Sequence, residues 1–240
     1  MNSFSKEEQE ILNNAKKYII EIFKDDSSGH DVEHSLRVYK NAMEISKNIL
    51  SNNSDTKLNL FIIALSALLH DVDDYKLKEN NSKNNQNNNL LQFCELNNIK
   101  NNNDINLIIE IISEVSYKAG ETKIPKTLEG KIVQDADRLD AMGAIGIARA
   151  FAFGGNKKRK IYDVKNIDTL YKRDFEPFNM DNITFEQYKN TKGDTVTHFY
   201  EKLLKLENMM NTEPAKIIAH KRTEFMKEYL KQLFEEIIEK

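Results

Sequence analysis

Hydrophobic residues recur at helical spacing through most of the chain, and short polar segments separate the apolar stretches. From Ser5 to Lys24 the apolar positions fall three and four residues apart, and Ser5 with Glu8 forms a capping-box pattern. A second helix is expected after the capping residue Asp31, and a third, almost wholly apolar helix from Leu60 to His70. The same spacing predicts further helices within 79–106 and over 104–118, 127–153, 194–211 and 213–239.

Two regions depart from this regular pattern. Asparagine dominates 79–106, which coding bias in an AT-rich genome explains more simply than a function does. Residues 156–190 are the least regular part, and we expect a long surface loop with a short helix there; a lid or partner surface is the alternative. Gly154 and Gly155 are expected to end the preceding helix, whereas Gly143 and Gly146 indicate close helix packing.

Composition narrows the fold class. Only 3 prolines and 8 glycines occur in 240 residues, which favours long helices over a sheet with frequent turns. The length suits one large domain with a substantial core. We therefore predict an all-α, single-domain helical bundle over 1–240, with a motif-bearing core of about 23–153 and C-terminal helices of about 194–239 packed on it.

Charge and hydropathy exclude several classes of protein. A net charge of -3 argues against a nucleic-acid binder that neutralises phosphates, despite the basic run from Lys157 to Lys160. No apolar run approaches the roughly 20 residues of a membrane span. The single cysteine, Cys94, suits a reducing compartment, and the polar N-terminus is unlike a targeting peptide. We expect a cytoplasmic protein with no membrane or nucleic-acid partner.

Buried charge identifies the candidate chemistry. The apolar third helix ends abruptly in His70 and Asp71, with Asp73 and Asp74 close behind. A buried imidazole or carboxylate without a partner is strongly disfavoured, and a divalent metal can partner both. Three aspartates within 134–140 are flanked by apolar residues, so this is a second place where buried charge is expected. Binding to the same metal is the simplest way to neutralise it.

Three short motifs occur in a fixed order: His34, then Leu-Leu-His70-Asp71, then Ala-Asp137-Arg-Leu. This order resembles the H…HD…D signature of the HD-domain metal-dependent phosphohydrolases. The chain is also similar to a bacterial-type subgroup, HD hydrolases that act as nucleotide pyrophosphohydrolases, over residues 29–38, 135–149 and 198–203. The asparagine-rich segment is the main departure, and it lies away from these motifs.

The resemblance implies the HD-domain fold and a metal site with the ligands His34, His70, Asp71 and Asp137. Imidazole and carboxylate ligands together suit Mn²⁺, Co²⁺, Ni²⁺, Fe²⁺ or Zn²⁺, and Mg²⁺ less well; among these ions we expect Mn²⁺. Four protein ligands on an octahedral ion leave one position for water and one for a phosphate oxygen. Relatives with two metals carry extra histidines between the HD pair and the last aspartate. This chain has none there, so one divalent ion is expected.

Helix phase suggests a catalytic role for Asp74, which faces the same side as His70 if the helix continues one turn. Its carboxylate would orient the attacking water or pass a proton to the leaving group. Asp73 is expected to cap the helix or meet solvent, and Asp140 to hold Arg138 or a ligand histidine. The candidate substrate contacts are His30, Asp31, Arg37, Lys118, Arg149, His198 and Lys202, with Arg222 as a further basic residue to test.

These observations predict a metal-dependent phosphohydrolase that acts on a nucleotide or a similar phosphorylated small molecule. The subgroup resemblance implies cleavage of a nucleoside triphosphate into monophosphate and pyrophosphate by a metal-activated water. Two alternatives stay open: a 5′-nucleotidase-type phosphomonoesterase, and a non-catalytic helical module that senses nucleotides. Nothing in the pattern indicates the oligomeric state.

Overall fold

The computed structural model describes residues 4–24, 31–53, 55–73, 88–190 and 193–238, and its regular elements there are helices without a strand. The all-α prediction is therefore confirmed. The helices are α1 (Lys6–Phe23), α2 (Val32–Asn52), α3 (Leu60–Leu69), α4 (Asn88–Leu96), α5 (Asn102–Val115), η2 (Ala119–Glu121), α6 (Leu128–Asp140), α7 (Gly143–Asn156), α8 (Val164–Tyr171), α9 (Phe185–Lys189), α10 (Thr195–Glu201), η3 (Leu203–Met209) and α11 (Glu213–Ile237).

The chain divides into two compact units. Unit 1 comprises residues 1–116 and 124–137, and unit 2 comprises residues 117–123 and 138–240. The chain therefore passes from one unit to the other three times, the last time within α6. The prediction of a single domain concerns how the two units associate, and it stays a prediction.

Side-chain caps start the first three helices as their sequences suggest. At α1 the Ser5 hydroxyl accepts from the backbone N–H of Glu8 while the Glu8 carboxylate accepts from that of Ser5, which completes the expected capping box. Asp31 caps α2, and the Asn59 side chain accepts from the N–H of Ile62 at the start of α3.

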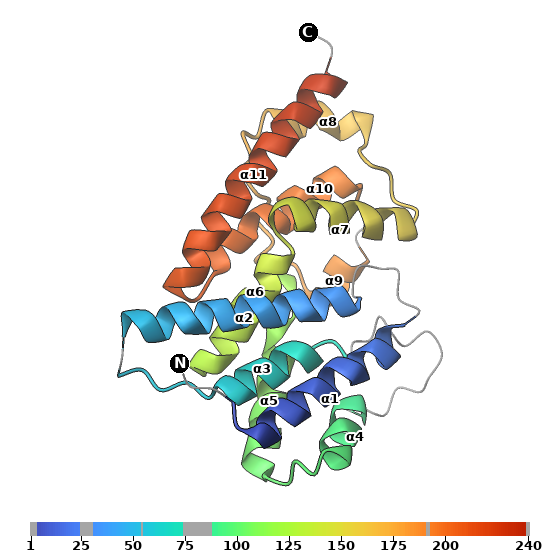
Figure 1. Ribbon diagram of the computed structural model, residues 1–240. Helices are drawn as coiled ribbons and strands as arrows, with labels where there is room; N and C mark the ends of the chain where they lie inside the picture. Colours follow the sequence, from blue (N-terminus) through green and yellow to red (C-terminus); the bar gives the residue numbers. More distant parts are fainter. Residues whose placement is uncertain (1–3, 25–30, 54, 74–87, 191–192, 239–240) are drawn as a thin grey trace. The chain divides into compact units, whose positions relative to one another are not determined.

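Helix α3 forms the centre of unit 1 and contacts α1, α2 and α5 (Figure 1). Every residue from Ile62 to Leu69 is buried. Full burial of one leucine or isoleucine side chain contributes about 1.5–3 kcal/mol, so α3 supplies a large share of the hydrophobic stabilisation of this unit. The amphipathic helices around it turn their apolar faces inward, as Ala15 and Ile19 do on α1.

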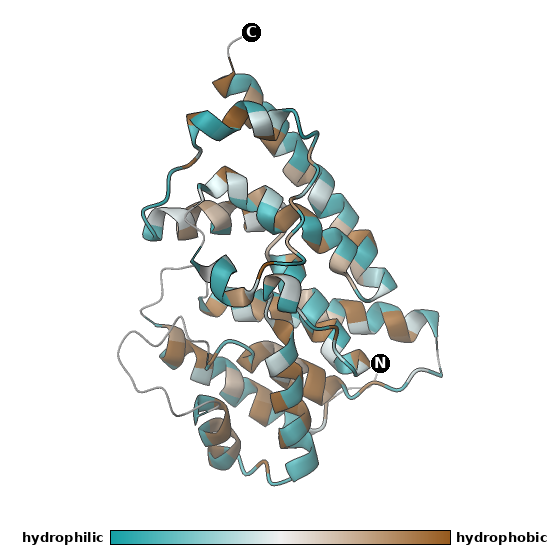
Figure 2. Cartoon of the chain, turned by 180° about the vertical axis from the view of Figure 1, so that it is seen from behind, coloured by the Kyte–Doolittle hydropathy of each residue, from teal (hydrophilic) through white to brown (hydrophobic). Residues whose placement is uncertain are grey.

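In unit 2, α7 contacts α10 and α11, and α11 also contacts η3. Helix α11 has one apolar face, and Figure 2 shows brown hydrophobic residues alternating with teal polar ones along it. Its buried residues are Ala215, Ala219, Thr223, Met226, Leu230 and Phe234.

The stretch predicted as one helix over 127–153 forms two helices, α6 and α7, which meet at Gly143. Gly143 has φ of 67°, a left-handed conformation that favours glycine. A Cβ there would lie 3.1 Å from Cγ of Arg222 on α11, so the close packing expected of this glycine is confirmed. A Cβ on Gly146 would lie 2.3 Å from the carbonyl oxygen of Ala141.

The prediction that Gly154 and Gly155 end a helix is wrong, because α7 continues through both of them to Asn156. Gly154 has a packing reason instead: a Cβ there would lie 2.3 Å from Oγ1 of Thr195 on α10. The following region, 156–190, holds two short helices, α8 and α9, where one was expected.

The asparagine-rich region contains α4, in which Leu90, Phe93 and Cys94 are buried, whereas Leu91 and Leu96 are exposed. Most of the polar run before α4 lies outside the described residues. None of the helices that the structure describes is long and apolar enough to cross a membrane.

Candidate metal centre

His34 is positioned by the first turn of α2. Asp31 is the N-cap of that helix, and its carboxylate accepts a hydrogen bond from the backbone N–H of His34 at 2.8 Å. A cap of this kind satisfies a helix N–H that has no intrahelical partner and contributes about 1 kcal/mol. The cap therefore holds the backbone of a fully buried histidine. Asp31 has this structural task, and its contact with substrate stays a prediction.

His70 and Asp71 follow directly after Leu69, the last residue of α3. Nδ1 of His70 lies 2.9 Å from the carbonyl oxygen of Ala67. A carbonyl oxygen only accepts hydrogen bonds, so Nδ1 carries a proton, and Nε2 would present its lone pair to a metal whenever the ring is neutral. The same bond satisfies a carbonyl group at the C-terminal end of α3.

Asp137 comes from α6. Its side chain is 25% exposed, whereas those of His34 and Asp71 are 1% and 7% exposed. Asp137 is therefore the most accessible of these groups, and a molecule that approaches the cluster from solvent would meet it first.

The side chains of these four residues converge on one point in unit 1. Nε2 of His34 lies 3.2 Å from Nε2 of His70, and 3.4 Å from both Oδ2 of Asp71 and Oδ1 of Asp137. Nε2 of His70 lies 3.4 Å from Oδ2 of Asp71 and 3.7 Å from Oδ1 of Asp137. The structure thus brings together all four predicted ligands, and the ligand atoms of His34, His70 and Asp137 lie within 4.8 Å of one another.

Within the cluster, His70 and Asp137 shift each other's pKa. Burial by itself lowers the pKa of the His70 imidazole, but the carboxylates of Asp71 and Asp137 outweigh burial and hold that pKa well above its usual value. Burial by itself raises the pKa of Asp137, but contacts with His34 and His70 outweigh it and hold this pKa well below its usual value. Both shifts show that the cluster stabilises positive charge at its centre.

This donor set fits a divalent ion. Bonds of about 2.0–2.2 Å from a metal to nitrogen and oxygen place adjacent ligand atoms about 2.8–3.1 Å apart at octahedral angles and about 3.3–3.6 Å apart at tetrahedral angles. The distances of 3.2–3.7 Å found here are close to these values. Two imidazole lone pairs and two carboxylates that face one another repel unless a cation lies between them. His34, His70, Asp71 and Asp137 could therefore hold one metal ion, and the protonated Nδ1 of His70 orients its ring for that task.

The remaining candidates of unit 1 differ in how much the structure says of them. Arg37 is half-buried on α2, one turn after His34. Asp73 accepts hydrogen bonds from the backbone N–H groups of Asn89 and Leu90, so it caps α4 rather than the helix before it. The role predicted for Asp74 assumed that α3 continues for one turn after His70. Residues 70–73 form turns instead and do not extend α3. His30 and Asp74 themselves lie outside the described residues.

In unit 2, two predicted substrate residues gather around a pair of tyrosines. The rings of Tyr188 and His198 stack with centroids 6.4 Å apart, and Tyr117 meets Tyr188 edge to face at 5.5 Å. Nζ of Lys202 lies 5.3 Å from the centroid of the Tyr117 ring, a cation–π arrangement. A third candidate, Lys118, directly follows Tyr117 in the chain.

Backbone contacts fix the segment that carries Tyr117 within this cluster. The N–H of Gly120 donates to the carbonyl of Ile183 at 3.2 Å, and the N–H of Phe185 donates to the Glu121 carboxylate at 3.1 Å. A Cβ on Gly120 would clash with the backbone carbonyl of Asp181. The close approach of the two segments therefore requires glycine at this position.

Two arginines of unit 2 have structural partners. Nη1 of Arg149 lies 2.8 Å from Oδ2 of Asp140, a carboxylate that is almost fully buried. Asp140 was expected to hold Arg138 or a ligand histidine, and the ion pair with Arg149 is a partner that its sequence position did not suggest. Arg222 donates to the carbonyl of Leu139. These contacts give Arg149 and Arg222 a role in folding beside any contact with substrate.

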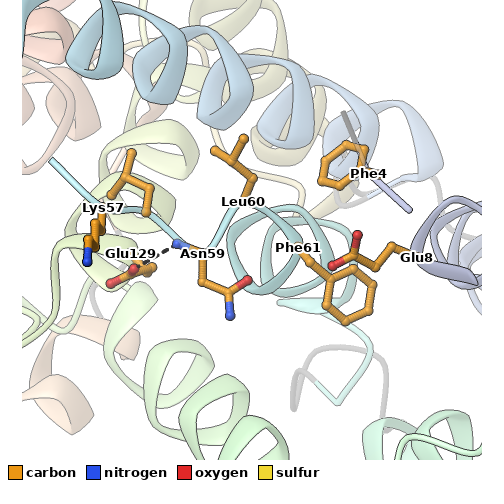
Figure 3. A pocket seen from close by; sticks show the side chains of 8 residues that line it. Phe4, Glu8, Lys57, Asn59, Leu60, Phe61 and Glu129 are labelled. Carbon is orange, nitrogen blue, oxygen red and sulfur yellow. Dashed lines mark hydrogen bonds between the residues drawn. The ribbon is translucent and has the colours of Figure 1, made fainter. Parts of the chain in front are cut away.

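A pocket of about 520 Å³ lies elsewhere in unit 1, at the N-terminal end of α3 (Figure 3). Leu60 and Phe61 line it, and Glu129 accepts a hydrogen bond there from the backbone N–H of Asn59. It contains none of the predicted site residues. The ten residues of α3 span about 15 Å and place His70 at the opposite end of the helix, so the pocket is separate from the metal centre.

Three residues near the candidate sites were missed by the sequence-based predictions. Tyr117 and Tyr188 belong to the cluster of unit 2, and Asn41 donates a hydrogen bond beside Asp137. Tyr188 lies in the irregular region, where no pattern marked it. Asn41 carried a usable signal: it is a polar residue two helical turns after His34, at a position that the spacing assigns to the buried face.

Comparison with known proteins identifies the family. The HD domain family matches residues 31–142. The protein YpgQ of Bacillus subtilis is 34% identical over 225 residues, which cover 92% of this chain and 91% of that protein. A crystal structure of YpgQ in complex with ADP superposes with a TM-score of 0.66 at 31% identity, over 96% of both chains.

Two further crystal structures are similar to this chain over nearly its whole length. A protein from Lactobacillus plantarum superposes with a TM-score of 0.74 at 33% identity, over 98% of both chains. An HD-superfamily hydrolase from Bacillus thuringiensis superposes with a TM-score of 0.65 at 34% identity, over 95% of this chain and 97% of the other. With the matched domain, the similarity of nearly the whole chain and the convergence of the H…HD…D residues, the protein belongs to the HD-domain superfamily of phosphohydrolases.

Proposed function

We propose that this protein is a phosphohydrolase with one divalent metal ion, and that it cleaves nucleoside triphosphates into monophosphate and pyrophosphate. The observation that carries the proposal is a pair of imidazole nitrogens 3.2 Å apart in unit 1, each of which lies within 3.4–3.7 Å of one oxygen of Asp71 and one oxygen of Asp137. Three of these residues, His34, His70 and Asp137, form the group of histidines and carboxylates that could hold an ion among the residues that the structure describes.

The charge of the ligand set suits a phosphorylated substrate. Neutral His34 and His70 with ionised Asp71 and Asp137 would balance a doubly charged ion, so a polyphosphate would approach a neutral centre without like-charge repulsion. A bound ion would supply Lewis-acid polarisation of a phosphoryl group and a water of lowered pKa. Imidazole and carboxylate donors together suit Mn²⁺, Fe²⁺, Co²⁺, Ni²⁺ or Zn²⁺, and of these we propose Mn²⁺.

A nucleotide as the substrate is supported by a relative. YpgQ, which resembles this chain over nearly its whole length, has been crystallised with ADP. The residues proposed to contact the nucleotide are those predicted from the sequence: His30, Asp31, Arg37, Lys118, Arg149, His198 and Lys202. Asp74 is proposed as the acid–base group that handles the proton of the attacking water or the leaving group.

A screen with two product assays tests this function. Purified protein is incubated with nucleoside tri-, di- and monophosphates in Mn²⁺, Co²⁺, Ni²⁺ or Mg²⁺, and inorganic phosphate and pyrophosphate are measured separately. We expect pyrophosphate and nucleoside monophosphate in equal amounts from a triphosphate. Inorganic phosphate without pyrophosphate would contradict the proposed cleavage and favour a phosphomonoesterase. Nucleotide binding without any turnover would indicate a sensing module instead.

A further inference from the structure

Asn41 is a buried amide on the helix that carries His34, and it is only 8% exposed. Residues seven apart on a helix lie on nearly the same face, so Asn41 and His34 face the same neighbouring elements from two successive levels of α2. A buried amide is expected to be hydrogen-bonded, because leaving its N–H groups without a partner is unfavourable.

The partner of Asn41 lies beside a metal ligand. Its Nδ2 donates to the carbonyl oxygen of Ala136 on α6 at 3.2 Å, across 95 positions of sequence. That carbonyl belongs to the planar peptide group whose nitrogen is the backbone N of Asp137. The hydrogen bond therefore restrains the peptide from which the Asp137 side chain departs, and it does so from the helix that carries His34.

The other ligands have their own restraints, which makes the role of Asn41 specific. His34 is held by the cap from Asp31, and His70 by its bond to the carbonyl of Ala67. For Asp137, the bond from Asn41 joins α6 to α2, and these two helices must keep Oδ1 of Asp137 within 3.4 Å of Nε2 of His34. Ligand groups have to be held to within about 0.5 Å for productive binding, so one buried hydrogen bond at this point can decide metal affinity.

We propose that Asn41 is a positioning residue for the metal ligand Asp137. The inference rests on the proposed function, since it assumes that the cluster binds a divalent ion. It goes further because it says that one side chain, which does not itself bind the ion, holds α2 and α6 at the correct distance at the site.

The test compares two substitutions on the same helix. Asn41→Leu keeps the size of the side chain and removes the donor. Ser46→Ala is the matched control, because Ser46 is also buried on α2 but its hydroxyl donates to the carbonyl of Ala42 within the same helix. Both proteins are freed of metal with EDTA, their melting temperatures are compared, and Mn²⁺ affinity is measured by competition with a metal-binding dye. The absorption spectrum of bound Co²⁺ reports the ligand geometry.

We expect Asn41→Leu to weaken Mn²⁺ binding by about 10- to 100-fold, the usual effect of losing a group that orients a metal ligand, and to alter the Co²⁺ spectrum. Ser46→Ala should keep the affinity and the spectrum of the unchanged protein. Unchanged affinity in Asn41→Leu, or an equal loss in Ser46→Ala, would overturn the inference. If Asn41→Leu does not fold, Asn41→Ala is measured with the same expectations. Absence of Mn²⁺ binding by the unchanged protein would refute the proposed function itself.

Discussion

Two histidines, His70 in unit 1 with a side chain 2% exposed and His198 in unit 2 with a side chain 21% exposed, have surroundings that drive their ionisation in opposite directions. At His70 the carboxylates of Asp71 and Asp137 outweigh burial and raise the pKa. At His198 burial is the largest influence, Glu201 opposes it, and Lys202 adds to it, so the pKa falls below its usual value. Nδ1 of His198 lies 3.8 Å from Oε2 of Glu201, too far for a hydrogen bond, and has no hydrogen-bond partner among the described residues.

The difference teaches that burial alone does not identify a metal ligand. His70 is surrounded by groups that require a cation, whereas His198 stacks on Tyr188 and is kept neutral. Among the described residues His198 belongs to no group of histidines and carboxylates that could hold an ion, and a ring stacked on a tyrosine suits contact with an aromatic ligand. The comparison therefore separates a centre that concentrates positive charge from a surface that is proposed to bind substrate.

The largest expected effect comes from removing a carboxylate beside His70. Asp71→Ala should abolish metal binding and reduce hydrolysis by about a thousand-fold or more, since loss of several kcal/mol of transition-state stabilisation corresponds to that factor. Asp73→Ala is the matched control two residues later. Because Asp73 caps α4, this change should lower stability by about 1 kcal/mol and leave the metal in place. Metal content and turnover of both variants check the pair; turnover retained by Asp71→Ala after loss of the metal would refute the mechanism.

A second effect concerns charge pairing in unit 2. Arg149→Met leaves the buried carboxylate of Asp140 without its 2.8 Å partner and should reduce stability by about 3 kcal/mol. For a chain of this length the melting temperature should fall by about 6–12 °C. Adding Asp140→Asn to the same protein should recover part of the loss, because the amide is neutral. An unchanged melting temperature with a raised KM would instead show that Arg149 acts on substrate.

The smallest effect tests the ionisation of His198 directly. Because its pKa is depressed in the folded protein, the unfolded chain binds the proton first, and stability should fall as the pH drops below about 6.5. His198→Phe keeps a ring against Tyr188 and removes the titration. The pH dependence of stability between pH 7 and 5 should become shallower, by at most about 1.4 kcal/mol per pH unit. The measurement is urea unfolding across that range in metal-free protein, and an unchanged slope would contradict the comparison.

The sequence predicted the helices best where one face is apolar and a cap is present. Ser5 with Glu8, and Asp31, marked the starts of α1 and α2 correctly. The errors came where tertiary packing overrides local preference. Position 154 is a glycine because Thr195 leaves no room for a side chain, and α7 does not end there. The break before Gly143 was missed because its apolar flanks continue on both sides.

For the candidate site, the order of the motifs along the chain identified the metal ligands, but the sequence did not show which distant residues contact them. His34, His70, Asp71 and Asp137 could be named because their motifs are short and ordered along the chain, and the structure brings them together. Tyr188 could not be named and Asn41 showed only as a polar residue on the buried face, since their roles depend on partners about seventy and about a hundred residues away in the sequence. Hydrogen bonds and ring contacts over such separations follow from packing, which periodicity alone does not specify.

The central claim is that the cluster around His70 binds one divalent ion. Isothermal titration of EDTA-treated protein with Mn²⁺ tests it most directly. The account predicts one ion per chain in the unchanged protein, loss of binding in Asp137→Ala, and unchanged binding in His198→Phe. Two ions per chain, or the same binding in Asp137→Ala as in the unchanged protein, would contradict it.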